Sequence, residues 1–586
     1  MSAAQISTSS TINSNGSRWI SLACAVLMVL IVADPLHAQF TYTDLYDFNC
    51  ATSAGGCHPF DWGELTQGAD GNLYGTASIG GAFQRGTIFK ATPGGAYTDF
   101  FDFSSADVTG ELPISALTLA TDGNFYGVAS LGTLFGPEVY RVTPSGSLTV
   151  LHNFDFAPPF PDLFLVGVPP VEASDSSGNS FLYGLTSEGA TYRITLPAGT
   201  FQQLSNNAPG QSFGPLLPAY GALYGTTADG GKYGNGTIFR MTTEGAISIV
   251  YSFTGGSDGS IPEAALTLGA DGNLYGTTAY GGANGAGEVF KLKLSPPICS
   301  LCGAVLTVLH SFEAFSSTLS PLCNNDGGEP AAGLLAATDG HFYGTTTAGG
   351  ANCIGTIFSV TAGGIFFKIF DFQECSMCGN PILGQFPFSA LVEHTNGLFY
   401  GLTAVGGVIP TLGPSGGNLY RLSPASSRFT VKVAGPIWVH PGEPVQFLGN
   451  NLEGALNVSF GPLSAQFHVG SNTFLVAQVP SAAIDGLVTV TLATGEQIES
   501  QATMHILPII TNLDPSAGTV GTQVGIVGGG LTGAIEATFG GVRATNFNVV
   551  TPNLIQAIVP TGARTGKVRV ITPNGVAASK TTFTVN

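Results

Sequence analysis

Hydrophobic and polar residues alternate over short stretches of the chain, and one such stretch returns seven times. Its fullest version is Leu-Thr-Leu-Gly-Ala-Asp-Gly-Asn-Leu-Tyr-Gly-Thr-Thr-Ala-Tyr-Gly-Gly at 266–282, followed by Glu-Val-Phe-Lys-Leu at 288–292. Alternation with a period of two is typical of strands that bury one face. A Tyr-Gly pair anchors each copy, beginning at Tyr74, Tyr126, Tyr183, Tyr224, Tyr275, Tyr343 and Tyr400. Repeats of roughly 40 to 70 residues that contain several short strands predict a propeller of repeated sheets.

Each repeat is expected to form four antiparallel strands. In the repeat around Tyr275 the first strand is 264–268, Asp271-Gly272-Asn273 is the hairpin turn, and the second strand is 274–278. Asp-Gly favours such a turn because Gly, Asn and Asp tolerate positive φ. The third and fourth strands follow the patterns of 86–90 and 97–103. Seven such units predict a seven-bladed β-propeller over residues 39–433, in which the surplus strand at 40–48 joins the last blade and closes the ring.

The order of strands predicts two unequal faces. The turns after the first and third strands are short and uniform, whereas the loops after the second and fourth strands are longer and vary between repeats. Loops on a rigid scaffold commonly carry binding residues. We therefore expect the face with the longer loops to be the binding surface.

Two further units follow the repeats. Residues 508–586 contain short alternating strands such as 554–559, 566–571 and 581–585, and residues 434–507 echo them at 441–449, 474–479 and 487–492. This spacing is typical of immunoglobulin-like sandwiches. The predicted fold is therefore all-β, with a propeller followed by two sandwich domains.

The N-terminus is predicted to be an export signal. Arg18 precedes an apolar run at 19–33, and Leu36-His37-Ala38 can end a cleavage site, which gives a signal peptide at 1–38. No other apolar run is long enough for a transmembrane helix, so the mature chain is expected to lack one. The protein is expected to be extracellular or in the cell envelope.

Composition agrees with this picture and narrows the partners. The 586 residues include 82 Gly and 35 Pro, and only 9% are charged, which suits short strands and tight turns. Removal of the signal takes away one Arg and one Asp and leaves the net charge of −19. Such a charge repels phosphates, so nucleic acid is not an expected partner. The expected partner is a polysaccharide or a surface protein.

Eight Cys remain after the signal peptide, and disulfides are expected in an exported chain. Cys50 and Cys57 bracket one loop and are predicted to pair, and Cys323 and Cys353 are predicted to lie on one face, where they could pair. The two C-x-x-C pairs, Cys299 with Cys302 and Cys375 with Cys378, are predicted to lie on opposite faces. An alternative is a four-thiolate metal site. The candidates for disulfides are Cys50, Cys57, Cys299, Cys302, Cys323, Cys353, Cys375 and Cys378, and those for the metal site are Cys323, Cys353, Cys375 and Cys378.

Other polar residues have structural and functional interpretations. His152 and His310 occupy the fourth-strand position that Tyr251 fills in another repeat, which favours a structural role. Acidic residues recur near the loops that enter each repeat, where they could bind Ca²⁺ or simply form turns, and the turn interpretation is preferred. Otherwise no cofactor is expected. These acidic residues are Asp61, Glu64, Glu111, Asp258, Glu263, Asp326 and Glu329.

These motifs resemble two known families. The pattern Asp-Gly-Asn-Leu-Tyr-Gly-Thr-Thr-x-x-Gly-Gly, followed by Gly-Thr-Ile-Phe-Lys, is similar to the GloVer tandem repeat of exported bacterial proteins over about 40–430. The two C-terminal units resemble IPT/TIG domains. The resemblance implies a surface or secreted protein with a C-terminal anchor and no shared enzymatic activity.

Three functions follow as hypotheses. The first is a non-enzymatic exported binding or adhesion protein that presents propeller loops on two sandwich modules. The second is an extracellular carbohydrate-active hydrolase or lyase with its site at the channel mouth, which requires carboxylates or His to converge there. The third is a self-assembling surface-layer or secretion component.

Overall fold

Short antiparallel strands account for nearly all regular structure in the computed structural model, which describes residues 40–49, 56–57, 59, 64–104, 111–131, 137–154, 168–175, 178–186, 189–205, 208–294, 303–316, 322–373, 385–406 and 415–586. The predicted signal peptide lies outside these residues. Within them the structure has no helix long and apolar enough to cross a membrane. A 3₁₀ turn, η2, spans Leu452–Gly454.

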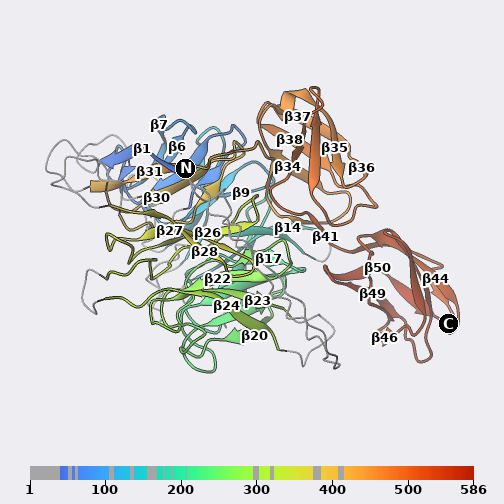
Figure 1. The fold of residues 1–586 in the computed structure, drawn as a ribbon. Coiled ribbons are helices and arrows are strands. Elements are labelled where there is room, and N and C mark those ends of the chain that lie inside the picture. The colour runs from blue at the N-terminus through green and yellow to red at the C-terminus, as the bar shows by residue number, and fades with distance from the viewer. Residues whose placement is uncertain are drawn as a thin grey trace, which may run out of the picture.

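The repeats form seven sheets, here numbered in chain order as sheets 1–7 (Figure 1). Sheet 1 consists of β3 (Thr66–Gln67), β4 (Leu73–Ala77), β6 (Thr87–Ala91) and β7 (Tyr97–Asp102), and sheet 2 of β8 (Glu111–Pro113), β9 (Thr118–Leu119), β10 (Phe125–Leu131), β11 (Glu138–Val142) and β12 (Leu148–Asn153). Sheet 3 consists of β13 (Val171–Ser174), β14 (Ser180–Leu185), β15 (Thr191–Thr195) and β16 (Phe201–Ser205). Sheet 4 consists of β17 (Leu217–Ala219), β18 (Ala222–Thr227), β19 (Thr237–Met241) and β20 (Ile247–Ser252). Sheet 5 consists of β21 (Thr267–Leu268), β22 (Leu274–Thr278), β23 (Glu288–Lys293) and β24 (Val305–Ser311). Sheet 6 consists of β25 (Leu335–Ala336), β26 (His341–Thr346), β27 (Thr356–Thr361) and β28 (Phe366–Asp371). Sheet 7 consists of β29 (Val392–Glu393), β30 (Phe399–Thr403), β31 (Ser415–Ser423) and β1 (Thr41–Asn49). A separate pair joins β2 (Gly56–Cys57) to β5 (Ile79–Gly80).

The N-terminal strand belongs to the last sheet. β1 pairs antiparallel with β31, with Tyr42 opposite Leu422. This pairing confirms the prediction that the surplus strand joins the last repeat. Sheet 3 also keeps four strands, and the Thr186 carbonyl next to β14 accepts from the Gly189 amide at 2.9 Å.

Neighbouring sheets share buried cores in a closed circuit. Sheets 1 and 2 meet around Tyr74 and Tyr140, and the series continues until sheets 7 and 1 meet around Tyr400 and Phe89. The intermediate cores join sheets 2 and 3, 3 and 4, 4 and 5, 5 and 6, and 6 and 7. The Tyr of each Tyr-Gly pair is buried, so these rings belong to the cores between the sheets.

The repeated residues have direct structural roles. The hydroxyl of Tyr74 donates to Asp70 of the preceding turn at 2.9 Å, and the same contact forms at Tyr126, Tyr275 and Tyr343. A Cβ on Gly75 would lie 2.4 Å from the Phe89 ring, so the residue after the Tyr must be Gly for this aromatic side chain to pack over it. Local contacts thus explain why the Asp-Gly-Asn-Leu-Tyr-Gly signature recurs.

Two sheets build each C-terminal sandwich, with four strands in each sheet of sandwich 1 and four and five strands in the sheets of sandwich 2. Sandwich 1 pairs β32 (Lys432–Ala434), β34 (Pro444–Leu448), β38 (Phe474–Gln478) and β37 (Phe467–Ser471) in one sheet, and β36 (Leu463–Ser464), β35 (Ala455–Phe460), β39 (Val488–Leu492) and β40 (Gln497–Glu499) in the other, with β33 (Trp438–Val439) parallel to β41 (His505–Ile506). Sandwich 2 has the same strand order. One sheet contains β42 (Ile509–Asp514), β44 (Gln523–Gly529), β48 (Leu554–Ile558) and β47 (Phe547–Thr551). The other contains β46 (Val542–Arg543), β45 (Glu536–Phe539), β49 (Gly566–Thr572) and β50 (Gly575–Val585), and β43 (Ala517–Gly518) is parallel to β50. The matching order agrees with the prediction that 434–507 echoes 508–586.

Sandwich 1 packs on the short turns between the first and second strands of the sheets. We name the side of the ring that carries these turns the turn face, and the opposite side the loop face. Trp438 packs against Tyr220 of sheet 4 with ring centroids 4.8 Å apart, and other contacts reach sheets 1, 2, 3 and 7. They are Thr473 Oγ1 to the Ala69 carbonyl at 2.7 Å, Gln446 to the Thr121 carbonyl, His440 Nε2 to the Asp175 carbonyl at 3.2 Å, and Asn450 Nδ2 to Thr395 Oγ1 at 3.0 Å. The turn face is therefore occupied by the chain itself.

The interface between sandwich 1 and sheet 3 contains Glu443, a carboxyl group whose ionisation is unfavourable there. Glu443 of sandwich 1 accepts from the His440 amide at 2.8 Å. Burial, together with the nearby carboxylates of Glu172 and Asp175 in sheet 3, raises the pKa of Glu443 to about 7, although the hydrogen bond from the His440 amide lowers it. Docking of sandwich 1 on sheet 3 is thus coupled to the protonation of Glu443.

We predict that Glu443→Gln raises the thermal midpoint at pH 8 and leaves it nearly unchanged at pH 5. The pKa of Glu443 in the folded protein lies above its usual value of 4.5. The free energy of unfolding therefore falls as pH rises from about 4.5 to about 7, by up to ~2–3 kcal/mol. Glu496→Gln, an exposed change in the same sandwich, is the control. An equal shift at both pH values would contradict the prediction.

Candidate functional site

The loop face presents aromatic side chains to solvent. Phe83, Tyr233 and Tyr280, between the second and third strands of sheets 1, 4 and 5, are 57%, 48% and 43% exposed. Phe386, in the segment that enters sheet 7, is 37% exposed. Exposed aromatic rings can stack on a bound ligand. Their position agrees with the prediction that the longer loops form the binding surface.

The loops that carry these rings are held by their own backbones. Tyr280 exchanges two backbone hydrogen bonds with Ser260, at 2.8 and 3.2 Å, which ties the loop after β22 to the loop that enters sheet 5. Gly281 follows with φ of 74°, and a Cβ there would lie 2.9 Å from the Ser260 nitrogen. The Gly-Gly pair is therefore required for the two loops to meet.

The innermost strands enclose a narrow channel. A cavity of about 20 Å³ is lined by residues from all seven sheets, which is room for about one water molecule. A ligand on the loop face must consequently lie across the channel mouth and not inside it. Its lining includes Glu64, Phe213, Glu263 and Phe388.

Two carboxyl groups converge near this mouth beside Tyr280. Burial raises the pKa of Glu263, and the charge of Glu329 on the neighbouring sheet raises it further. Burial also raises the pKa of Glu329 and that of Tyr280, and both carboxylates add to the shift at Tyr280. The Glu329 amide donates to the Ala286 carbonyl in the Tyr280 loop at 2.9 Å, which places the entry to sheet 6 against sheet 5. The charge of Glu329 thus acts on Glu263 across the boundary between sheets 5 and 6.

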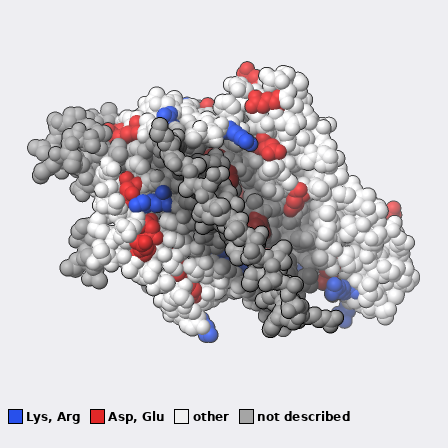
Figure 2. Space-filling model, viewed as in Figure 1, with Lys and Arg blue, Asp and Glu red and all other residues white. Residues whose placement is uncertain are grey.

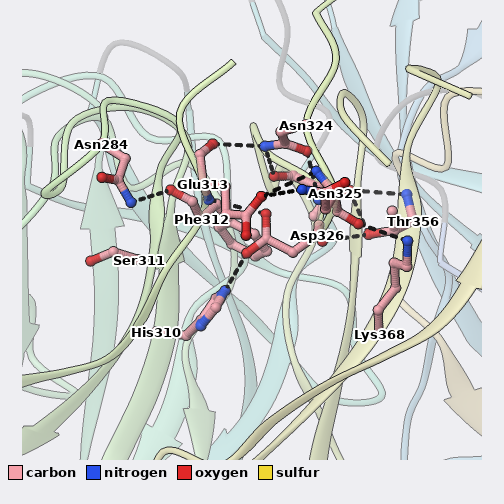
Figure 3. Close-up of polar contacts among 12 residues, drawn as sticks. Asn284, His310, Ser311, Phe312, Glu313, Asn324, Asn325, Asp326, Thr356 and Lys368 are labelled. Atoms are coloured by element: carbon pink, nitrogen blue, oxygen red, sulfur yellow. Dashed lines mark hydrogen bonds and ion pairs between the residues drawn. The ribbon is translucent and has the colours of Figure 1, made fainter. Parts of the chain in front are cut away.

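A polar network fixes the loop between sheets 5 and 6 (Figure 3). The carboxylate of Asp326 contacts His310 Nε2 at 2.8 Å and accepts from the Glu313 amide at 3.0 Å. Asn324 donates to the carbonyls of Glu313 and Gly327 at 2.7 and 2.6 Å, and Lys368 Nζ donates to the Asn325 carbonyl at 2.7 Å. This loop is thus internally bonded, and Asn324 is a residue that sequence reasoning did not identify.

His152, His310 and Tyr251 do occupy equivalent positions. Each pairs with the second residue of the adjacent third strand next to a bulge. His152 stacks on Phe201 and His310 on Phe366, with ring centroids 3.5 and 3.7 Å apart. These contacts confirm the structural interpretation of both His residues.

Two of the acidic residues near the loops, Asp258 and Asp326, are bonded within turns. Asp258 accepts from the Tyr251 hydroxyl and from the Thr254 amide, both at 2.9 Å, as Asp326 does from His310 and Glu313. Burial opposes ionisation of Asp258, but the hydrogen bonds from Thr254 and Tyr251 prevail and lower its pKa. In the described ranges, no group of three or more His, Cys, Asp or Glu is placed to hold a metal ion, so the Ca²⁺ hypothesis gains no site there. Asp61 lies outside those ranges, as does the side chain of Glu111.

Some of the Cys residues lie within the ranges that the structure describes, and the others lie outside them. Cys323 and Cys353 form a disulfide with Cα atoms 4.4 Å apart, next to the Asn324 network. The four-thiolate alternative is wrong, because these two sulfurs bond to each other. Cys57 also takes part in a disulfide, and Cys50, its predicted partner, is not among the described residues. Cys299, Cys302, Cys375 and Cys378 also lie outside the description, so their pairing stays a prediction.

Carboxylate side chains are spread over the face drawn in Figure 2, with occasional Lys and Arg side chains between them. Lys90 pairs with the turn carboxylate of Asp70 and Lys291 with that of Asp271, both at 2.6 Å. The surface therefore disfavours polyanionic ligands.

Family comparisons identify both parts of the chain. The Gloeobacter/Verrucomicrobia repeat matches residues 34–192 and 169–320, and the IPT/TIG domain matches residues 508–585. This is a protein of Gloeobacter/Verrucomicrobia repeats with a C-terminal IPT/TIG domain, as its sequence motifs predict. The IPT/TIG assignment of 434–507 stays a prediction. No curated protein matches the chain.

Several solved structures are similar to the chain. They include the surface glycan-binding protein PbSGBP-B from Prevotella bryantii, with 14% identity, coverage of 28% of this chain and 40% of that chain, and a TM-score of 0.19. SGBP-B from a complex xyloglucan utilization locus in Bacteroides uniformis has 17% identity, coverages of 26% and 48%, and a TM-score of 0.15. The extracellular domain of a hybrid two component system from B. thetaiotaomicron has 10% identity, coverages of 92% and 65%, and a TM-score of 0.40. The chain spans less than half the length of the two glycan-binding proteins.

We predict that the Cys323–Cys353 disulfide stabilises the loop-face segment between sheets 5 and 6. The bond joins residues 30 apart, and closing such a loop in the unfolded chain corresponds to roughly 3–4 kcal/mol by chain entropy. Peptide mapping without reductant should recover the linked pair, and the Cys323→Ser/Cys353→Ser variant should melt at lower temperature. Recovery of both as free thiols from native protein would contradict this.

Proposed function

We propose that the protein is an exported surface or secreted protein that binds polysaccharide through the loop face of a seven-bladed β-propeller. The seven sheets in a closed circuit and the channel lined by all of them support the propeller assignment. In this proposal residues 39–433 form the propeller, and 434–507 and 508–586 form two IPT/TIG-type spacer or docking domains. The signal peptide at 1–38 accounts for export.

The observation that carries the proposal is the contrast between the two faces. Sandwich 1 occupies the turn face, whereas the loop face exposes Phe83, Tyr233 and Tyr280 beside hydrogen-bonding groups. Flat aromatic rings stack on the apolar faces of sugar rings, and neighbouring polar groups bind the hydroxyls. The acidic surroundings favour a neutral polysaccharide over a polyanionic one.

Replacing single loop-face aromatic residues should weaken polysaccharide binding. A screen of soluble neutral polysaccharides by affinity electrophoresis would identify a ligand. Phe83→Ala, Tyr233→Ala and Tyr280→Ala are each expected to raise its Kd about fivefold or more, because a stacked ring contributes ~1 kcal/mol. Ile365→Ala, an exposed apolar residue on the fourth-strand side of sheet 6, is the matched control and should bind like wild type. Retention of full affinity by all three aromatic variants would exclude this surface as the binding site. If a pull-down instead recovers a protein ligand whose binding these variants abolish, the partner of this surface is a protein and not a polysaccharide.

A carbohydrate-active hydrolase is the second candidate, and the Glu263–Glu329 pair is the observation that favours it. Glycoside hydrolysis commonly uses two carboxyl groups that flank the scissile bond, one of them kept protonated by a raised pKa. Burial of Glu263 supplies such a raised pKa. Tyr280 lies beside the pair and could bind the substrate.

If this second candidate is correct, release of reducing sugar should accompany binding in the same wells. Glu263→Gln and Glu329→Gln should each reduce that release by at least ~100-fold, the typical contribution of a general acid or base. Binding should persist in both variants, since the amide keeps the shape of the side chain. Turnover that is unchanged in the Gln variants, or absent from wild type on every bound polysaccharide, would remove this candidate.

A further inference from the structure

A second cavity lies between the ring and sandwich 1, away from the loop face. Its volume is about 560 Å³, within the range of small-ligand sites and far larger than the central channel. One wall comes from the turn face of sheets 5 and 6 and includes Leu268 and Phe342. The opposite wall comes from β40 and the segment after it and includes Gln497 and Glu499. The cavity thus offers both apolar and polar side chains to a ligand.

The segment that connects the ring to sandwich 1 supplies Arg428 and Phe429 to this cavity. Phe429 is 49% exposed. Among the described residues, neither the guanidinium of Arg428 nor the side-chain amide of Gln497 has a hydrogen-bond or ion-pair partner. Lys90 and Lys291 elsewhere on the ring are neutralised by Asp residues. Arg428 is therefore a cation with unused donors beside an exposed ring and a roomy cavity.

We propose that this interdomain cavity binds a short oligosaccharide that carries a single carboxylate, that is, a sugar with one uronic acid unit. A guanidinium binds a carboxylate through two parallel hydrogen bonds, a geometry that a neutral sugar cannot satisfy. The ring of Phe429 offers a stacking surface for the adjacent sugar, and Gln497 offers an amide for its hydroxyls. Glu499 on the polar wall disfavours a second negative charge. The proposal does not depend on the function of the loop face.

The test compares two disaccharides that differ only in the carboxylate, cellobiouronic acid and cellobiose, titrated calorimetrically into the full mature chain. Cellobiouronic acid is expected to bind at least tenfold more tightly than cellobiose. Arg428→Gln should abolish that preference, and Phe429→Ala should weaken both disaccharides, whereas Phe429→Tyr should retain binding. Arg564→Gln removes the same charge from an exposed position of sandwich 2 and should behave like wild type.

Three results would overturn the proposal. Equal affinity for both disaccharides would show that the carboxylate is not recognised. Wild-type affinity in Arg428→Gln, with an unchanged melting temperature, would exclude Arg428 as the ligand of the acid. Loss of binding in Phe83→Ala would move the site to the loop face.

Discussion

The structure depends on how each sheet is joined to the next around the circuit. In the best-matching repeats the Thr after Tyr-Gly donates to a carbonyl of the neighbouring sheet's inner strand, as Thr76 does to Ser115 at 2.8 Å and Thr226 to Ala264 at 3.0 Å. Where Val128, Leu185 and Leu402 replace this Thr, other polar contacts join the sheets nearby. The Thr121 amide donates to Glu172 at 2.8 Å, and Gln67 and Thr395 exchange two hydrogen bonds at 2.8 and 3.1 Å between sheets 1 and 7. Each sheet is thus positioned by its neighbour, and the loop face is rigid enough to hold exposed rings in place.

Much of this arrangement could be predicted from sequence because its causes are local. The Asp-Gly turn, the Tyr that reaches back to the Asp, and the Gly that admits an aromatic ring all lie within a few residues of one another. The closing strand was predictable because residues 40–48 repeat the pattern of a fourth strand. The structural role of His310 followed from its register with Tyr251.

Contacts between distant segments left no such signal. Nothing periodic marks Trp438 or Gln446 as residues that dock on the turns, and sandwich 1 begins with β32 at Lys432, inside the range 39–433 predicted for the propeller. The pairing of Cys323 with Cys353 was one of two open alternatives, because spacing alone does not separate a disulfide from a thiolate metal site. The convergence of Glu263 and Glu329 arises from two different sheets, 66 residues apart by their numbers (329 − 263). Such pairs depend on the circuit as a whole.

A crystal structure of the mature chain with side chains resolved would test the central claim, that the repeats form a closed circuit whose turn face is covered by sandwich 1. We predict seven sheets around one axis, β1 paired with β31, Trp438 against Tyr220, and Phe83, Tyr233 and Tyr280 exposed on the opposite face. An open row of sheets, a circuit with six or eight of them, or sandwich 1 packed over the Tyr280 loops would contradict the account.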